Sequence, residues 1–323
     1  MGYPYESDNG VVTWAWLRGI KMKNITAVVV TYNRKELLVR CIEHLRKQTV
    51  KPDSIIVINN GSTDGTKEWL DGQADLDVIH QENVGGSGGF YRGIEHAYES
   101  GYEWIWCMDD DVFPEPDCLE ILMKHDDEKT GILCPIRRQE GKIFISEIKQ
   151  FNLTNPFKSL HIHELTQEDV KDQDAISIEG MAFEGPLIKR EVVERIGLPN
   201  KELFLLYDDS DYSYRTVLAG YQVKLVTNAI LNKEKFFADD DRVTQVQKGK
   251  WKLYYHIRNT VYFNRKYGKN ICVRNLRPIG VMLQYQGYVL KNIFFNNKYQ
   301  MSDMKVFFHA YRDGVKGRLG RQQ

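Results

Sequence analysis

A strand, a turn and an amphipathic helix follow one another twice near the start of the chain, and this repeat constrains the fold more than any other feature. Residues 24–30 (NITAVVV) are a β-branched run typical of a buried strand, and residues 35–47 bring apolar side chains to one face of a helix. The pattern continues with predicted strands at 54–58, 77–80 and 104–108 and predicted helices at 66–70 and 93–100. This alternation predicts an α/β fold with a mostly parallel sheet that is covered by helices.

Polar side chains follow three of these strands. Thr31 follows the first strand, Asn59 follows the second, and "WCMDDDVFPEPD" places Asp109, Asp110 and Asp111 directly after the fourth. Because ligands of open parallel sheets bind beyond the carboxyl ends of the strands, we predict a site at this edge. Three adjacent carboxylates behind an apolar stretch repel one another unless a cation or solvent relieves them. The alternative is a solvated acidic turn.

Residues 83–93 (NVGGSGGFYRG) form a glycine-rich segment between the third and fourth strands. We predict a loop whose backbone passes close to a phosphate, with the forked donor of Arg92 beside it. The segment matches neither a Walker P-loop nor a Rossmann fingerprint, and a flexible linker is the alternative. A second acidic cluster, "LLYDDSDYSYR", stands at a predicted helix N-terminus, where capping alone is the alternative explanation for Asp208 or Asp209.

Composition limits the class of protein. Of the 323 residues 42% are hydrophobic, enough for a substantial core, and a formal net charge of zero argues against a general nucleic-acid binder. From residue 265 onward twelve basic residues accompany two acidic ones, so this region carries about +10. Five widely spaced cysteines without a C-x-x-C pair indicate a reducing cytosol. No run reaches the roughly 18 to 20 apolar residues of a membrane span, and residues 1–21 are predicted to be a leader or an accessory arm.

Together the motifs resemble the inverting, metal-dependent family-2 glycosyltransferases of the GT-A fold. The resemblance runs in order from about 24 to 267 through "VVVTYNRKELL", "IIVINNGSTDGT", "NVGGSGGFYRG", "MDDDV" and "LLYDDSDYSYR". The glycine-rich segment combined with the aspartate triplet is most similar to the galactofuranosyltransferase branch, in which a segment like "YYHIRN" also follows. The resemblance implies a Rossmann-like GT-A catalytic domain at 22–250 and a basic, aromatic helical extension at 251–323.

The resemblance also implies roles for individual residues. A Mn²⁺ or Mg²⁺ ion would bridge the aspartates and the diphosphate of a nucleotide sugar, with UDP as the expected nucleotide. Asp110 and Asp111 would hold the metal. Asp209 would be the general base that takes the proton from the acceptor hydroxyl, with Asp208, Asp211 and Glu179 as supporting or acceptor-binding neighbours. The implied donor-binding residues are Thr31, Asn33, Arg34, Asn59, Asn83, Gly85, Gly86, Gly89, Arg92, Asp109, Asp110 and Lys233.

Two positions depart from the family's pattern. Asn59 stands where an aspartate usually accepts the uracil N–H, which leaves a dTDP donor and a rhamnosyltransferase activity open. Near the end of "VTNAILNKEKF", Asn232 and Lys233 stand where a histidine commonly completes the metal site. Either Lys233 contacts the diphosphate directly, or water and phosphate oxygens complete the coordination. A carbohydrate-binding module of the same fold without turnover is the alternative to an enzyme.

We therefore expect an inverting hexosyltransferase that moves galactofuranose from UDP onto a hydroxyl of a cell-surface glycan or a lipid-linked acceptor. The expected location is the cytoplasm. The basic and aromatic C-terminal region predicts peripheral contact with the anionic inner face of the cell membrane. Packing of these helices on the catalytic domain, or formation of a homo-oligomer, is the alternative.

Overall fold

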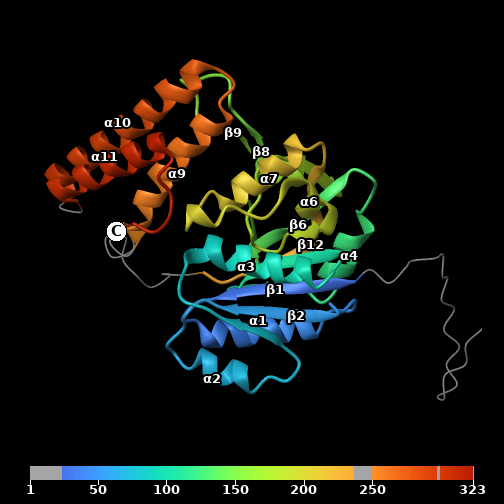
Figure 1. The fold of residues 1–323 in the computed structure, drawn as a ribbon. Coiled ribbons are helices and arrows are strands. Elements are labelled where there is room, and N and C mark those ends of the chain that lie inside the picture. Colours follow the sequence, from blue (N-terminus) through green and yellow to red (C-terminus); the bar gives the residue numbers. More distant parts are fainter. Residues whose placement is uncertain (1–23, 236–248, 297–298, 323) are drawn as a thin grey trace, which may run out of the picture.

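The computed structural model describes residues 24–235, 249–296 and 299–322 (Figure 1). The predicted leader at 1–21 lies outside these residues. The strands are β1 (Ile25–Thr31), β2 (Ser54–Asn59), β3 (Asp77–His80), β4 (Trp104–Asp109), β5 (Val112–Pro114), β6 (Thr130–Gln139), β7 (Lys142–Phe144), β8 (Ile148–Phe151), β9 (His161–Glu164), β10 (Ala175–Ile178), β11 (Leu187–Lys189) and β12 (Gln222–Lys233). The helices are α1 (Lys35–Arg46), α2 (Thr66–Asp71), α3 (Gly85–Glu99), α4 (Cys118–Lys124), α5 (Gln167–Val170), α6 (Arg190–Ile196), the 3₁₀ turn η1 (Lys201–Leu203), α7 (Asp208–Leu218), α9 (Lys252–Tyr267), α10 (Ile271–Asn296) and α11 (Met301–Lys316).

The central sheet follows the order β10-β12-β6-β11-β4-β1-β2-β3. The pairs β1–β2, β1–β4, β2–β3 and β6–β12 are parallel, whereas β11 runs antiparallel to both of its neighbours and β10 runs antiparallel to β12. The predicted α/β fold with a mostly parallel sheet is therefore confirmed. The chain leaves β1 towards β2 and β3 on one side but returns to β4 on the other, so the strand order reverses between β1 and β4.

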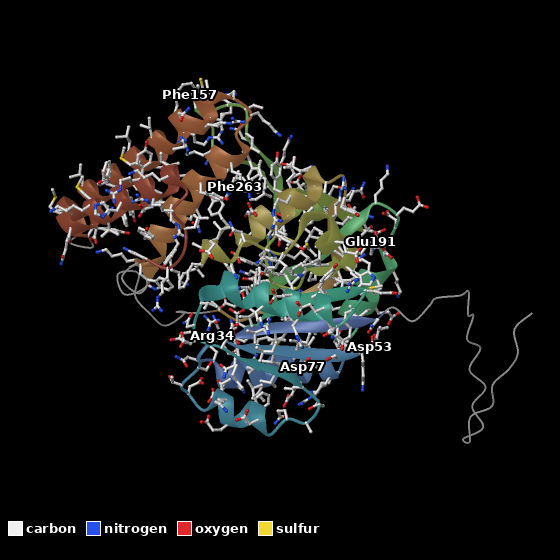
Figure 2. All side chains as sticks on the ribbon, in the orientation of Figure 1. Arg34, Asp53, Asp77, Phe157, Glu191 and Phe263 are labelled. Atoms are coloured by element: carbon white, nitrogen blue, oxygen red, sulfur yellow. The ribbon has the colours of Figure 1, made fainter. Side chains whose placement is uncertain are left out.

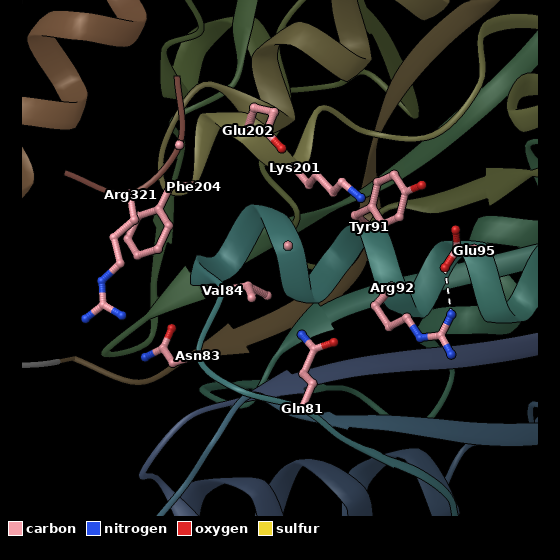
Figure 3. Close-up of a pocket in the computed structure, with 12 residues that line it drawn as sticks. Gln81, Asn83, Val84, Tyr91, Arg92, Glu95, Lys201, Glu202, Phe204 and Arg321 are labelled. Atoms are coloured by element: carbon pink, nitrogen blue, oxygen red, sulfur yellow. Dashed lines mark hydrogen bonds and ion pairs between the residues drawn. The ribbon is translucent and has the colours of Figure 1, made fainter. Parts of the chain in front are cut away.

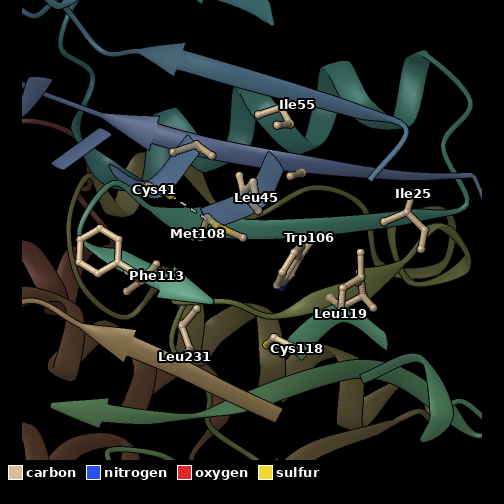
Figure 4. Packing of buried hydrophobic residues seen from close by; sticks show 14 of the residues in the cluster. Ile25, Cys41, Leu45, Ile55, Trp106, Met108, Phe113, Cys118, Leu119 and Leu231 are labelled. Carbon is tan, nitrogen blue, oxygen red and sulfur yellow. Dashed lines mark hydrogen bonds between the residues drawn. The ribbon is translucent and has the colours of Figure 1, made fainter. Parts of the chain in front are cut away.

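Alternating side chains of the strands supply two separate apolar cores. Ala27 and Val29 of β1 point to one face, where they share a cluster with α1, α4 and Trp106 of β4. Figure 4 shows this cluster, with Leu45 of α1, Leu119 of α4 and Trp106 among the labelled residues. Val28 and Val30 point to the other face, where α3, α6 and α7 cover the sheet. Since successive strand residues alternate between the faces, a strand buried on both sides needs the continuous β-branched run seen at 24–30.

The glycine-rich segment is not the loop that the sequence predicted. Helix α3 begins at Gly85 rather than at residue 93, so that the glycines form its first turns. Glycine is a weak helix former, but here close packing of the segment on β1 outweighs that low helix propensity. A Cβ at Gly89 would lie 2.5 Å from Val30 Cγ1, and one at Gly93 would lie 2.3 Å from Val28 Cγ1. The missing side chains let α3 lie directly on β1.

The predicted helical extension is also confirmed. Figure 1 shows α9, α10 and α11 side by side at one end of the molecule, and they share a core that includes Tyr255, Val289 and Phe307. Helix α9 continues to the α/β part of the molecule, where Phe263 and Tyr267 pack with Tyr214 of α7. Among the described helices, none combines the length and the apolar character that crossing a bilayer requires.

Candidate active site

The aspartate triplet lies at the point where the strand order reverses. Val30 of β1 pairs with Asp109 of β4, and Thr31 pairs with Asn59 of β2, so the predicted polar positions share one sheet edge. Thr31 Oγ1 donates to Asp110 Oδ2 at 2.7 Å. Arg34, in the turn after β1, donates through one guanidinium nitrogen to Asp110 Oδ1 at 3.1 Å and Asp111 Oδ2 at 3.4 Å. Figure 2 shows Arg34 at this end of the sheet.

Burial makes the triplet a site of concentrated and costly negative charge. Burial raises the pKa of Asp109 well above its ordinary value, and Asp111 and Glu184 raise it further. Burial also raises the pKa of Asp110 to about 6, although Arg34 opposes the shift. The pKa of Asp111 is raised by burial against the opposing charge of Lys233. Carboxylates in such a setting gain most from a bound cation.

Lys233 occupies the place where the sequence lacks the expected histidine. Its Nζ forms an ion pair with Glu184 and lies 3.8 Å from Asp111 Oδ2. Glu184 also pairs with the buried Arg137, which in turn holds Glu147 at 2.6 Å. Burial alone would raise the pKa of Glu184, but Arg137 and Lys233 outweigh it and lower the pKa. Glu184 is therefore ionised and supplies a fourth carboxylate to the site.

The fit of a divalent cation can be judged from the carboxylate oxygens that have no hydrogen-bond partner. Asp111 Oδ1 is buried and has no hydrogen-bond partner, and a hard carboxylate oxygen in that state suits Mn²⁺ or Mg²⁺. Both oxygens of Asp110, in contrast, already accept hydrogen bonds from Thr31 and Arg34. Within the described ranges, no three His, Cys, Asp or Glu side chains converge as a complete metal site. Asp111 is thus the better placed of the two predicted ligands, and a metal there needs further ligands from donor or solvent.

Asn33 and Asn59 shape the loops around the triplet. Asn33 adopts a left-handed backbone with φ of 54°, and its Oδ1 accepts from Thr63 N at 2.7 Å. Asn59 Oδ1 accepts from Ser62 N at 3.0 Å, and its Nδ2 lies 3.0 Å from His80 Nδ1. These contacts join the turns after β1 and β2. The side-chain amide of Asn59 is consequently committed to the protein itself.

Asn83 and Arg92 line a cavity of about 500 Å³ beside α3, which the close-up in Figure 3 shows. Its other walls include Lys201, Phe204 and Arg321, and no aspartate of the triplet. Arg92 forms a 2.7 Å ion pair with Glu95 on its own helix. The structure therefore places these two predicted donor-binding residues in a cavity of their own.

Of the predicted glycines, Gly85 is needed for packing, as is Gly89, which lies against β1. Gly85 has φ of +80°, and a Cβ there would lie 2.1 Å from the carbonyl oxygen of Phe204. Gly86 has open space around it, and a Cβ there would meet only Leu205 Cδ1, at 3.9 Å. Asn60, which the sequence did not single out, fixes this helix start because its Nδ2 donates to Gly85 O at 3.0 Å.

The second acidic cluster forms the first turn of α7, as predicted. Burial, followed by the neighbouring charge of Asp208, raises the pKa of Asp209 to about 7. Burial raises the pKa of Asp208 to about 6. Asp211 is 1% exposed and accepts from Arg215 Nε at 2.9 Å, Lys266 Nζ at 2.7 Å and the Tyr267 hydroxyl at 2.7 Å. Asp211 therefore ties α7 to α9, which favours an orienting role over contact with an acceptor.

Glu179 stands beside this helix. Its Oε2 accepts from Phe151 N at 2.7 Å, and its backbone carbonyl accepts from Ser213 Oγ of α7 at 2.8 Å. Burial raises the pKa of Glu179. These contacts connect the β8–β9 hairpin to α7 and give Glu179 a supporting position.

The turn before Asp208 is strained and is held from α9. Phe204, Leu206 and Tyr207 have positive φ values of 64°, 67° and 69°, which non-glycine residues adopt at a cost. Asn259 Nδ2 donates to the carbonyls of Leu203, Leu205 and Leu206 at 3.1, 2.9 and 2.8 Å. Arg258 adds a 2.8 Å bond to Leu203 O. This clamp, Arg258 and Asn259 on the turn 203–207, sets where α7 presents Asp208 and Asp209.

Sequence reasoning missed three contributors to the site: Glu184, Arg137 and the clamp. Glu184 belongs to none of the predicted motifs, and its pairing partner Arg137 is 47 positions away. The signal for the clamp was present, since Arg258 and Asn259 end the quoted "YYHIRN". Arg258 is fully buried, and polar side chains buried in an apolar helix point to hydrogen-bonding duties.

Comparison with known proteins gives this geometry a context. Residues 26–197 match the family described as glycosyl transferase family 2. Galactofuranosyltransferase GlfT1 of Mycolicibacterium smegmatis is 30% identical over 204 residues, which span 61% of this chain and 66% of that protein. The match thus covers just under two thirds of that relative's length. The dTDP-rhamnosyl transferase RfbF of Shigella flexneri is 24% identical over 309 residues, 92% of this chain and 97% of that one.

Among solved structures, GalNAc-T7 in complex with UDP, GalNAc and Mn²⁺ has a similar fold. The TM-score is 0.55 at 15% sequence identity, and the superposition covers 86% of this chain and 58% of that one. At this identity the likeness concerns the fold alone, and it agrees with the GT-A arrangement of sheet and helices described above.

Proposed function

The chain belongs to glycosyl transferase family 2, and we propose that it is an inverting transferase that moves galactofuranose from UDP onto a hydroxyl of a glycan or lipid-linked acceptor. The observation that carries the proposal is the presence of two acidic groups with different properties. One is the triplet, whose buried charge calls for cations. The other is Asp209, whose pKa is raised to about 7, near the value that suits a general base.

We assign the proton transfer to Asp209. Its carboxylate takes the proton of the acceptor hydroxyl while the acceptor oxygen forms a bond to the anomeric carbon. The bond from that carbon to the diphosphate oxygen breaks, and its electron pair leaves with the nucleoside diphosphate. Because attack and departure occur on opposite faces of the sugar, one displacement inverts the configuration, and a single base suffices.

The charge that develops on the leaving group falls on the other half of the site. Arg34 and Lys233 bring positive charge to the triplet, and Lys252 of α9 lies within electrostatic reach of Asp109 and Asp111. A Mn²⁺ or Mg²⁺ ion bound through Asp111, with support from Asp110, would supply Lewis-acid stabilisation of the departing diphosphate. In this arrangement Lys233 acts at the position of the missing histidine, while Asn232 turns away to pair with Glu115 at 2.7 Å.

The experiment that tests the proposal is the substitution Asp209→Asn. We expect transfer to fall by at least about 10²-fold, the contribution of a general base, while the affinity for UDP stays unchanged. Glu191→Gln, on the exposed side of α6, is the matched control and should retain the wild-type rate. An Asp209→Asn variant that kept more than about a tenth of the rate would exclude Asp209 as the base.

A dTDP-rhamnose donor is the second candidate. Two observations favour it: Asn59 in place of the usual aspartate, and a match to a dTDP-rhamnosyl transferase along 92% of this chain. Release of nucleoside diphosphate from a panel of UDP- and dTDP-sugars, measured with a glycan acceptor present, decides between the two donors. Release of nucleoside diphosphate from none of these sugars would instead support the non-catalytic carbohydrate-binding module.

We further place the protein in the cytoplasm, in peripheral contact with an anionic membrane. All five cysteines are free thiols, which fits a reducing compartment. The outer face of α10 exposes Leu276, Ile279, Leu283 and Leu290, and the exposed Lys291 directly follows Leu290. Exposed apolar side chains with flanking cations are the combination that anionic lipid surfaces attract.

A further inference from the structure

A cavity of about 350 Å³ lies between α9, α11 and the segment 318–322, which follows α11. Figure 1 shows this end of the chain beside α9. Gly320 O accepts a hydrogen bond from the side chain of Arg258. Gln322 N donates to the Tyr255 hydroxyl at 3.0 Å. The segment therefore has a defined place, and the wall that it gives to the cavity is fixed with it.

The lining of this cavity carries an excess of positive charge. Its described residues include four arginines and one aspartate, which gives a net charge of +3 with His309 counted as neutral: Arg258, Arg312, Arg318, Arg321 and Asp313. Asp313 lies 3.9 Å from Arg312 Nε and accepts from the Tyr254 hydroxyl at 2.8 Å. Neither Arg318 nor Arg321 has a carboxylate partner among the residues that the structure describes. The cavity should therefore attract anions.

Arg258 is the buried member of this group, with 1% of its surface exposed. Its guanidinium donates to Leu203 O, Gly320 O and Asn259 Oδ1, which are all neutral acceptors. Burial lowers the pKa of Arg258, and nearby tyrosines and Asp313 offset this only in part. A buried cation whose hydrogen-bond partners are neutral gains from an anion that approaches it.

The chemistry of the lining favours one class of anion. A guanidinium presents a planar fork of N–H groups, and that fork matches the oxygens of a phosphate group in pairs. A phosphomonoester carries a charge of about −1.5 to −2 at neutral pH, which is closer to the excess of the lining than the single charge of a carboxylate. Leu319 is the one aliphatic residue of the described lining, so charge and hydrogen bonds, and not apolar contact, would hold the ligand.

We propose that this cavity is an anion site that holds a phosphate group between Arg258, Arg318 and Arg321. The phosphate belongs either to a small soluble phosphate compound or to the headgroup of a lipid. Arg321 also lines the separate cavity beside α3, where Figure 3 shows it. The site is independent of the proposed function, because none of these three arginines is assigned to the donor, the metal or the acceptor. Through Arg258, which also holds Leu203 O in the clamp, an occupant would bear on the turn 203–207.

The end of the chain offers a matched pair of variants for a test. Arg318 and Lys316 are both exposed and stand two positions apart, but only Arg318 lines the cavity. Arg318→Gln and Lys316→Gln each remove one positive charge from the same part of the surface. Neither should impair folding, because both side chains are exposed.

Binding of pyrophosphate is measured by calorimetry at physiological salt and without divalent metal. Arg318→Gln should weaken the binding at least about tenfold, because it removes charge-assisted hydrogen bonds, and Lys316→Gln should change it less than about twofold. Any pyrophosphate that binds at the aspartate triplet is bound equally by both variants, so the difference between them reports on this cavity.

A second measurement separates the two sources of the phosphate. Both variants are co-sedimented with vesicles that contain phosphatidic acid and with vesicles matched in charge by phosphatidylserine. If a lipid headgroup is the ligand, Arg318→Gln should lose binding to phosphatidic acid alone. If a soluble compound is the ligand, the two variants should bind all vesicles equally and differ only towards pyrophosphate. The site is refuted if neither ligand depends on Arg318 more than on Lys316, since net charge alone then explains any attraction.

Discussion

Asn259 lies on α9, but we expect it to control the position of Asp209, the proposed base. Its amide has two N–H groups, which serve the carbonyls of Leu203, Leu205 and Leu206 in a turn with three left-handed non-glycine residues. Asn259→Ala removes both donors. At about 0.5 to 1.5 kcal/mol for each net hydrogen bond, and more for a carbonyl left buried and unpaired, the expected loss is about 2 to 4 kcal/mol. For a chain of this size that corresponds to a fall in Tm of roughly 3 to 6 °C.

Activity should respond differently from stability. Once the Asn259 bonds of the clamp are gone, only the Arg258 bond to Leu203 O remains, so the strained turn should relax and move Asp208 and Asp209 with the start of α7. A displacement of about 1 Å at a reacting group can cost roughly 10²-fold in rate, so kcat should fall at temperatures at which the variant remains folded. The affinity for UDP should stay near the wild-type value, because the triplet and Arg34 stand at the ends of β4 and β1 and not in this turn.

Two further variants make the prediction specific. Asn259→Asp should be less stable than Asn259→Ala, because it replaces N–H donors by a carboxylate that faces three carbonyl oxygens. Asn275→Ala is the control: Asn275 is exposed on α10, its Nδ2 donates to Ile271 O at 2.9 Å, and its Oδ1 accepts an exposed hydrogen bond from Arg265 at 2.9 Å, so its loss should cost less than about 1 kcal/mol. Thermal unfolding and steady-state kinetics are measured on all three. The reasoning is wrong if Asn259→Ala melts with the wild type, or if it loses UDP affinity and kcat together.

Three other predictions concern Asp209, Asp111 and the basic C-terminal helices. The kcat/KM for transfer should rise with pH through about 7, where Asp209 loses its proton, and the rise should move to lower pH in Asp208→Asn, because the neighbouring charge that helps to raise the Asp209 pKa is gone. Asp111→Ala should weaken the binding of Mn²⁺ and of UDP together in calorimetric titrations. If the wild type binds UDP equally well with and without Mn²⁺, Lys233 is favoured as the diphosphate partner. The protein should co-sediment with vesicles rich in anionic lipid and be released as salt rises, and equal binding to neutral vesicles, or none to either, would assign the basic helices to packing or self-association.

The part of the site that the sequence predicted is the part that lies at strand ends. Carboxyl ends of neighbouring parallel strands meet at one edge, so Thr31, Asn59 and the triplet could be placed together from periodicity alone. The acidic cluster at Asp208 could also be predicted from neighbouring residues alone, because acidic residues are favoured at a helix N-terminus. These predictions needed no knowledge of how distant segments pack.

The glycine-rich segment shows why local reasoning failed elsewhere. By propensity, four glycines in five residues predict a loop, and no local rule could reveal that Val28 and Val30 of β1 would approach the helix so closely. Tertiary packing overrode propensity there. Glu184 was missed for the same reason, because its place in the site depends on ion pairs with Arg137 and Lys233, which lie 47 and 49 positions away.

Lys233 shows what the combination of sequence and structure adds. The sequence showed that a histidine was absent and that either Asn232 or Lys233 stood in its place. Because adjacent residues of a strand point to opposite faces, only one of them can face the aspartates, and pairing along β12 decides that it is Lys233. A permanent cation between Asp111 and Glu184 lowers the electrostatic cost of the acidic site before any donor arrives. The same cation would compete with the proposed metal for those oxygens, so the strength of any metal requirement should depend on whether the diphosphate draws Lys233 away from Asp111.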